Sequence, residues 1–187
     1  GTVMGNSAEW TAIGLFTVDK PSTSAYSTSF SGLGRISSKM GGLYNSAISF
    51  PATVKAVLSE ISSATGVKID TGSLDTSLVI ETKPSGYMYR EMLAFIAGFY
   101  FGYATEAADG SVIIRQYQKT ATASTNGDKT TELPTFQDLD AVVTGVKVVV
   151  GTETDSEGNS QDKFYSKGTV NVAVSNPIMT QAIFNKY

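Results

Sequence analysis

Four oxygen-bearing side chains in the last third of the chain are close enough in sequence to ligate a metal ion: Asp155, Glu157, Asn159 and Asp162. Their alternation is similar to that of a calcium loop, in which carboxylate and amide oxygens wrap a hard cation. An EF-hand loop needs a glycine where Ser160 stands, and it needs a later glutamate that this segment lacks. The same residue types are typical of a polar turn between two strands. We favour the turn.

Carboxylates that could serve as a general acid and base are scattered along the chain. Glu60, Glu81, Glu91 and Glu106 are far apart, and nothing in their sequence context pairs them as glycoside hydrolysis requires. Glu91 falls in the first turn of a predicted helix, where the helix dipole favours a negative charge without any catalytic role. The chain contains no histidine and no cysteine, so the commonest general base, thiolate nucleophiles and zinc–thiolate sites are excluded. We predict that the protein is not an enzyme and uses no cofactor or metal.

Charge and hydropathy exclude two further classes of partner. The formal net charge is −3 and the basic residues are dispersed, so there is no basic stripe to neutralise nucleic-acid phosphates. No run approaches the roughly 20 apolar residues that span a bilayer, and we expect no membrane insertion. The glycines form neither a GxGxxG nor a P-loop pattern. The chain opens with Gly1-Thr2-Val3, and we expect it to be a piece of a longer protein.

The elements that would position these residues are organised around the apolar segment 87–117. A strand at 101–106, a turn at Asp109-Gly110 and a strand at 111–117 are predicted to follow a helix in this segment. The helix is indicated by apolar side chains at i, i+3, i+4, i+7, i+10 and i+11, which are Tyr89, Met92, Leu93, Ile96, Phe99 and Tyr100.

A second amphipathic helix is predicted at 48–66, with Pro51 in its first turn and Gly66 at its left-handed C-terminal position. Short strands are expected at 67–70 and 78–81. Because each helix is followed by a strand, we predict an α+β fold with two helix–strand units on a small sheet. The flanking antiparallel β segments could belong to small β barrels.

The flanking regions complete a division into four parts. Residues 1–45 are predicted to be β-rich, with strands at 10–20 (closed by Pro21) and 25–30 and a helical turn at 35–40. Residues 46–117 form the α/β domain. The polar, Thr-rich stretch 118–140 is predicted to be a loop or linker, and 141–187 to hold a β-hairpin, with 164–175 in its returning strand, and the start of a C-terminal helix.

Aromatic side chains around the second helix are the remaining candidate site. Helical spacing favours core packing first, a subunit interface second, and stacking against a sugar ring third. Phe95 lies off the apolar stripe of the helix, and aromatic residues are enriched at interfaces. We predict a possible subunit interface at Phe95, Tyr100 and Tyr103.

The order of these segments resembles the central part of tail hub proteins of long-tailed bacteriophages and prophages. In that family a strand with an IPLGxFxV-like motif precedes an FPxTLxxxLxxI helix, a YREVLxYIAxxxG helix, a hairpin and an NPxM segment. The matching residues of the first two motifs are Ile13, Gly14, Phe16, Val18, Phe50, Pro51, Thr53, Leu58 and Ile61. Those of the YRE motif are Tyr89, Arg90, Glu91, Leu93, Ile96 and Ala97, and Asn176-Pro177 precedes Met179.

The resemblance implies a non-enzymatic structural role in a virion tail that is assembled in the bacterial host cytoplasm. Such hub proteins form a trimeric ring that closes the tail tube and links it to the distal tail protein and baseplate. The full-length protein is therefore expected to be a homo-oligomer that binds other phage tail proteins. The alternative is a cell-surface carbohydrate-binding module of a tail tip or adhesin, which exposed aromatic residues and Ser/Thr-rich β segments would suit.

Overall fold

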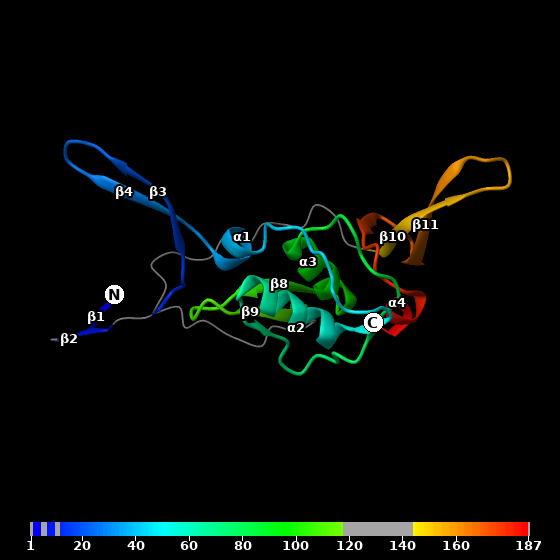
Figure 1. The fold of residues 1–187 in the computed structure, drawn as a ribbon, viewed down its shortest axis with the longest axis horizontal. Helices are drawn as coiled ribbons and strands as arrows, with labels where there is room; N and C mark the ends of the chain where they lie inside the picture. The colour runs from blue at the N-terminus through cyan, green and yellow to red at the C-terminus, as the bar shows by residue number, and fades with distance from the viewer. Residues whose placement is uncertain (1, 5–6, 10–11, 118–143, 187) are drawn as a thin grey trace. The chain divides into compact units, whose positions relative to one another are not determined.

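The computed structural model describes residues 2–4, 7–9, 12–117 and 144–186, and its helices and strands are labelled in Figure 1. The chain divides into two compact units. The first unit consists of Gly1–Gln116 together with Ile178–Tyr187, and the second consists of Tyr117–Pro177. The loop or linker predicted at 118–140 lies outside the described residues.

Helix α2 (Val54–Thr65) has a well-defined start and end. The Thr53 hydroxyl accepts a hydrogen bond from the Ala56 N–H (3.2 Å), which satisfies one of the amides that the first turn leaves unpaired. Gly66 ends the helix at φ 68°, as predicted. The predicted start was wrong. Residues 52–53 are extended because β5 (Ala52–Thr53) pairs with β7 (Val79–Ile80), so Pro51 precedes the helix.

Helix α3 (Tyr89–Phe99) begins where the Glu91 carboxylate accepts a hydrogen bond from the Met88 N–H (2.7 Å). Its apolar stripe is buried as the periodicity predicted, and the predicted helix face is confirmed. Fully buried side chains along it are those of Met92, Leu93, Ile96, Ala97 and Phe99. Tyr44 also packs edge-on against Tyr89, with ring centroids 5.8 Å apart.

A three-stranded sheet receives one strand from the first helix–strand unit and two from the second. Its order is β6 (Ile69–Asp70), β9 (Val112–Gln116), β8 (Gly102–Glu106), with β6 parallel and β8 antiparallel to β9. Helix α2 precedes β6, α3 precedes β8, and both helices lie against the sheet (Figure 1). The predicted α+β class is therefore confirmed. Helix α4 (Gln181–Lys186) adds Ile183 and Phe184 to the buried residues of this unit.

The N-terminal part of the first unit contains two hairpins and a short helix. Strands β1 (Thr2–Met4) and β2 (Ser7–Glu9) pair with each other, as do β3 (Thr17–Thr23) and β4 (Thr28–Leu33). The strands predicted at 10–20 and 25–30 were therefore placed too early. Pro21 does not end β3, because a bulge lies before it in a two-stranded sheet where a missing N–H is tolerated.

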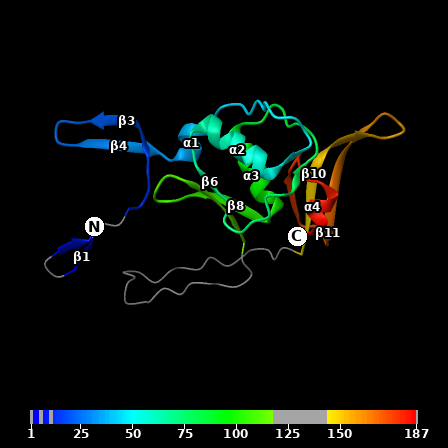
Figure 2. The same ribbon diagram turned by 60° about the horizontal axis from the view of Figure 1, so that its bottom comes forward.

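Helix α1 (Arg35–Lys39) follows β4 and confirms the predicted helical turn. Both views show the β3–β4 hairpin joined to α1 and apart from α2 and α3 (Figures 1 and 2).

The second unit is built on β10 (Gly145–Thr154), which pairs antiparallel with β11 (Ser160–Gly168) and parallel with β12 (Val172–Ser175). The prediction of one returning strand across 164–175 was wrong. Gly168 adopts φ 77° and ends β11, and the chain then passes to the other side of β10. A Cβ at Gly168 would lie 2.4 Å from the Thr144 carbonyl oxygen, so only glycine fits there.

Candidate functional site

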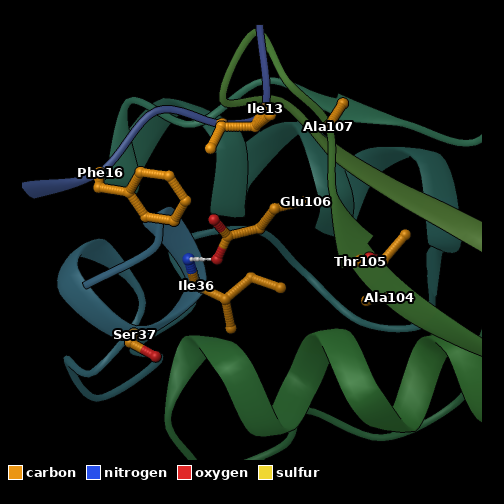
Figure 3. Close-up of a pocket in the computed structure, with 9 residues that line it drawn as sticks. Ile13, Phe16, Ile36, Ser37, Ala104, Thr105, Glu106 and Ala107 are labelled. Carbon is orange, nitrogen blue, oxygen red and sulfur yellow. Dashed lines mark hydrogen bonds between the residues drawn. The ribbon is translucent and has the colours of Figure 1, made fainter. Parts of the chain in front are cut away.

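A hollow of about 480 Å³ lies between the segment before β3, helix α1 and the end of β8 (Figure 3). Ile13 and Phe16 line it from the first segment, Ile36 from α1, and Glu106 from β8. In Figure 3 the Phe16 ring and the Glu106 carboxylate both point toward Ile36. The site is thus a hollow around one carboxylate, lined about equally by polar and apolar atoms.

The Glu106 carboxylate holds the start of α1. One oxygen accepts a hydrogen bond from the Arg35 N–H (2.8 Å) and the other accepts one from the Ile36 N–H (2.7 Å). A side chain at Gly34 would collide with the Glu106 carboxylate, so the glycine leaves room for the carboxylate in this position. A tertiary contact therefore replaces the side-chain cap that Gly34 cannot supply.

This geometry suits binding better than catalysis. Both oxygens of Glu106 already accept backbone hydrogen bonds, so the carboxylate has a structural role at α1. The other polar side chains around the hollow are the hydroxyls of Ser37 and Thr105. A hollow that combines apolar and polar lining atoms in this way can receive a side chain of a partner.

A second hollow, of about 390 Å³, lies beside α2. Lys55 and Lys68 line it together with five hydroxyl-bearing side chains, which are those of Ser59, Ser62, Ser63, Thr71 and Thr76. One acidic group near the hollow offsets part of its positive charge. Lys68 lies near enough to Asp109 to help lower the pKa of that carboxyl, which the Ser111 hydroxyl lowers most. Asp75, next to Thr76, bonds Lys186 in α4 (2.6 Å), and that hydrogen bond lowers the Asp75 pKa to about 2.

The three aromatic residues predicted at an interface lie in different environments. Tyr100 is fully buried and its hydroxyl donates to the Asp75 carbonyl (2.8 Å), so its ring belongs to the core of the first unit. Phe95 is half-buried and packs edge-on against Tyr87, with centroids 5.1 Å apart. Tyr103 is 41% exposed on β8. The sequence signal did not separate the buried ring from the two on the surface.

Glu60 connects α2 to the loop before it. Its carboxylate accepts hydrogen bonds from the Tyr44 hydroxyl (2.6 Å), the Ser46 hydroxyl (2.8 Å) and the Ala47 N–H (2.6 Å). Burial alone would raise the pKa of Glu60, but the donors, led by Tyr44, outweigh it and lower the pKa. Burial and the bond to Glu60 raise the pKa of Tyr44.

The other predicted carboxylates are held separately. Glu91 caps α3 and Glu106 caps α1, while Glu81 is exposed. The structure therefore does not assemble the four glutamates into an acid–base pair. The sequence did not indicate the role of Glu106, because its hydrogen-bond partners Arg35 and Ile36 are about 70 positions away along the chain.

The acidic segment 155–162 forms the turn between β10 and β11. The Asp155 carboxylate accepts hydrogen bonds from the Glu157 N–H (2.9 Å), the Asn159 N–H (2.8 Å) and the Gln161 amide (2.9 Å). The Asn159 N–H, despite the opposing effect of burial, contributes most to lowering the Asp155 pKa. Asp162 pairs with Lys147 at 3.0 Å. The carboxylates of Asp155 and Asp162 are thus engaged in the turn and the strands.

Two other kinds of feature are absent from the described residues. No group of three or more acidic, histidine or cysteine side chains in residues 12–117 and 144–186 is placed to hold a metal ion. Among the helices that the structure describes, none is long and apolar enough to cross a membrane.

Comparison with known proteins shows a similarity of fold to one solved structure. No protein-family model and no curated protein matches the sequence. The crystal structure of the tail protein from Neisseria meningitidis MC58 superposes with a TM-score of 0.55 at 13% sequence identity. The match covers 93% of this chain and 58% of that protein, so this chain spans little more than half the length of its structural neighbour. The two chains share a fold.

Proposed function

We propose that the chain is a non-enzymatic structural part of a phage or prophage tail hub, connecting the tail tube to the baseplate or tail tip. The observation that carries the proposal is the agreement of two likenesses over the same residues. The ordered motifs resemble those of tail hub proteins, and the fold over 93% of the chain resembles that of a protein named as a tail protein.

The motif residues of the two helices have structural positions in this fold, which supports a scaffold role. Leu58 and Ile61 are buried on α2, and Leu93 and Ile96 are buried on α3. Thr53 caps α2. What the resemblance retains is therefore the packing of two helices on a sheet rather than a set of reacting groups.

The environments of the carboxylates also support a role without catalysis. Glu60, Glu91 and Glu106 each accept hydrogen bonds from backbone N–H groups of a nearby loop or helix start. An acid–base mechanism needs two carboxyl groups that face a common substrate, and these three hold separate parts of the chain.

Deletion of the encoding gene tests the proposal in the phage or lysogen that carries it. We expect particles without tails, or tail tubes without tips, in electron micrographs of the lysate, and recovery when the intact gene is supplied. A gene with Leu93→Asp should fail to restore tails, and one with the exposed Glu81→Ala should restore them. Normal infectious tails after deletion would refute the proposal.

A second experiment tests the proposed partners. Full-length protein should associate with the tail-tube and distal tail proteins, and light scattering should give the mass of a trimer. A strictly monomeric full-length protein that binds neither component would contradict a hub role.

The carbohydrate-binding alternative rests on exposed aromatic side chains on β8 and just before it. Tyr103 is 41% exposed and Phe101 is 38% exposed, and such rings can stack on sugars. A glycan array would detect the activity. Tyr103→Ala should then abolish binding while Tyr26→Ala, at a fully exposed tyrosine in the β3–β4 turn, leaves it intact. No glycan bound by the wild-type chain would eliminate this alternative.

A further inference from the structure

The second hollow, beside helix α2, brings basic and hydroxyl-bearing side chains together. Its volume of about 390 Å³ is within the usual range of roughly 300–1,000 Å³ for sites of small ligands. Three segments line it, which are one side of α2, strand β6 with the residue before it, and the loop that follows β6. Polar groups from separate parts of the chain therefore converge on a space of ligand size.

Every charged residue that lines this hollow is basic. Lys55 is exposed in the first turn of α2, and Lys68 is exposed just before β6. In the described part of the chain neither ammonium group forms an ion pair. Asp109 lies near Lys68, but its carboxylate already accepts hydrogen bonds from the Ser111 N–H (2.9 Å) and hydroxyl (2.6 Å). The hollow therefore keeps a positive charge that an anion can neutralise.

The hydroxyl groups on this side of α2 are available to a ligand. A serine or threonine in a helix often bonds back to the carbonyl one turn earlier, as Thr65 does with Ile61 (2.7 Å). The hydroxyls of Ser59, Ser62 and Ser63 make no such bond to the described residues. Each hydroxyl has one donor and two acceptor sites, so these groups can bind the oxygens of an anion or the hydroxyls of a polyol.

The charge of the hollow indicates which anion suits it. A phosphate monoester carries about −1.5 to −2 charges at pH 7 and three acceptor oxygens, which matches two ammonium groups, and lysine is a common phosphate ligand. A carboxylate brings a single charge. Nucleic acid does not fit, because its phosphates require an extended basic surface and this chain has a net charge of −3.

We propose that this hollow binds a phosphate monoester of a polyol. Lys55 and Lys68 hold the phosphate group, and the serine hydroxyls of α2 hold the polyol. The proposal adds a binding site to the first unit, and it holds whether or not the protein belongs to a tail hub. Glycerol 3-phosphate is the simplest probe of this ligand class.

Chemical-shift titrations of the 187-residue chain test the proposal with glycerol 3-phosphate, inorganic phosphate and glycerol. We expect glycerol 3-phosphate to give saturating shifts of the amides in 55–63 and 68–76, and to bind several times more tightly than inorganic phosphate. Glycerol alone should not bind. The absence of saturation, or shifts spread over lysines elsewhere, would overturn the proposal. Equal affinity for inorganic phosphate and glycerol 3-phosphate would overturn the assignment to a polyol.

Matched lysine variants distinguish a binding site from general charge attraction. Lys55→Gln and Lys68→Gln should each weaken binding of glycerol 3-phosphate at least about tenfold, because each removes a charge-assisted hydrogen bond. Lys83→Gln, at an exposed lysine that does not line the hollow, should leave the affinity unchanged. The three variants change the net charge equally, and their urea unfolding should match that of the wild type. Equal weakening by all three would refute the proposed site.

A serine variant tests the polyol half of the site. Ser62→Ala should weaken glycerol 3-phosphate severalfold and leave the affinity for inorganic phosphate unchanged, because it removes a hydroxyl and no charge. Ser38→Ala, at a serine in α1 that does not line this hollow, is the control and should change neither affinity. An unchanged affinity of Ser62→Ala for glycerol 3-phosphate would contradict the role given to the α2 hydroxyls.

Discussion

Helices α2 and α3 and the β3–β4 hairpin use the same apolar residue types with opposite results. Val57, Leu58, Ile61, Leu93 and Ile96 are at most 5% exposed, whereas Phe16, Val18 and Phe30 are more than half exposed. The difference is one of partners, since the helices cover a sheet and each other while the hairpin has only two strands. Folding stability is thus concentrated in the helical part, and the hairpin leaves apolar side chains exposed.

The largest expected effect follows from placing a charge in each region. Leu93→Asp should cost about 4 kcal/mol or more, because a buried carboxylate without a partner must be desolvated or neutralised. Most domains have only about 5–15 kcal/mol of stability, so we expect the first unit to unfold or melt far earlier. Phe30→Asp should change the free energy of unfolding by less than about 0.5 kcal/mol. Thermal and urea denaturation of both variants measure the contrast, and equal losses would contradict it.

Glu60→Ala should have the next largest effect. The buried hydroxyls of Tyr44 and Ser46 would lose their acceptor, which should cost about 2 kcal/mol in urea denaturation. Glu81→Ala, at an exposed glutamate, is the matched control and should be neutral. A similar loss for both variants would show that the effect is one of net charge rather than of this network.

The pH dependence of the same network has a definite sign. Because folding lowers the pKa of Glu60, its contribution is present above the unfolded value of 4.5 and is lost as the pH falls through the lower folded pKa. The wild type should therefore lose stability below pH 4.5 more steeply than Glu60→Ala. Urea midpoints measured on either side of that pH would reveal it, and parallel curves would contradict the assignment.

A backbone effect of about 1 kcal/mol is expected from Gly66→Ala. Gly66 has φ 68°, where an L-residue is strained, and a Cβ there would meet no atom within 4 Å. The loss should therefore come from conformation alone. Gly151→Ala, at a glycine with equally open space and no positive φ, should not show it. Urea denaturation of both variants would test the distinction.

The features that the sequence predicted correctly are those that depend on residues close together along the chain. The α3 face, the Gly66 end of α2 and the α+β class follow from side-chain spacing and from the freedom of glycine at positive φ. The start of α2 was predicted wrongly because pairing of Ala52 with Ile80, a contact 28 positions apart, keeps the preceding residues extended. No local pattern contains that contact.

The candidate site could not be predicted from the sequence for the same reason. Glu106 and the start of α1 are joined by hydrogen bonds across about 70 positions, and the only local indication was Gly34, whose missing side chain leaves room for the carboxylate. The exposure of the hairpin could not be foreseen either. Alternation predicts that one face of a strand is buried against other residues. It does not show whether those residues belong to the same chain.

Glu106→Ala should have the smallest effect on global stability and the most informative local one, because this side chain ties the base of the β3–β4 hairpin to β8. Loss of the cap leaves the N–H groups of Arg35 and Ile36 without their acceptor and should cost about 0.5–1 kcal/mol. Hydrogen exchange of these two amides should accelerate severalfold, while amides of α3 keep their protection. If exchange in α3 rose equally, α1 would unfold only together with the core, and this would contradict a separate anchoring of the hairpin.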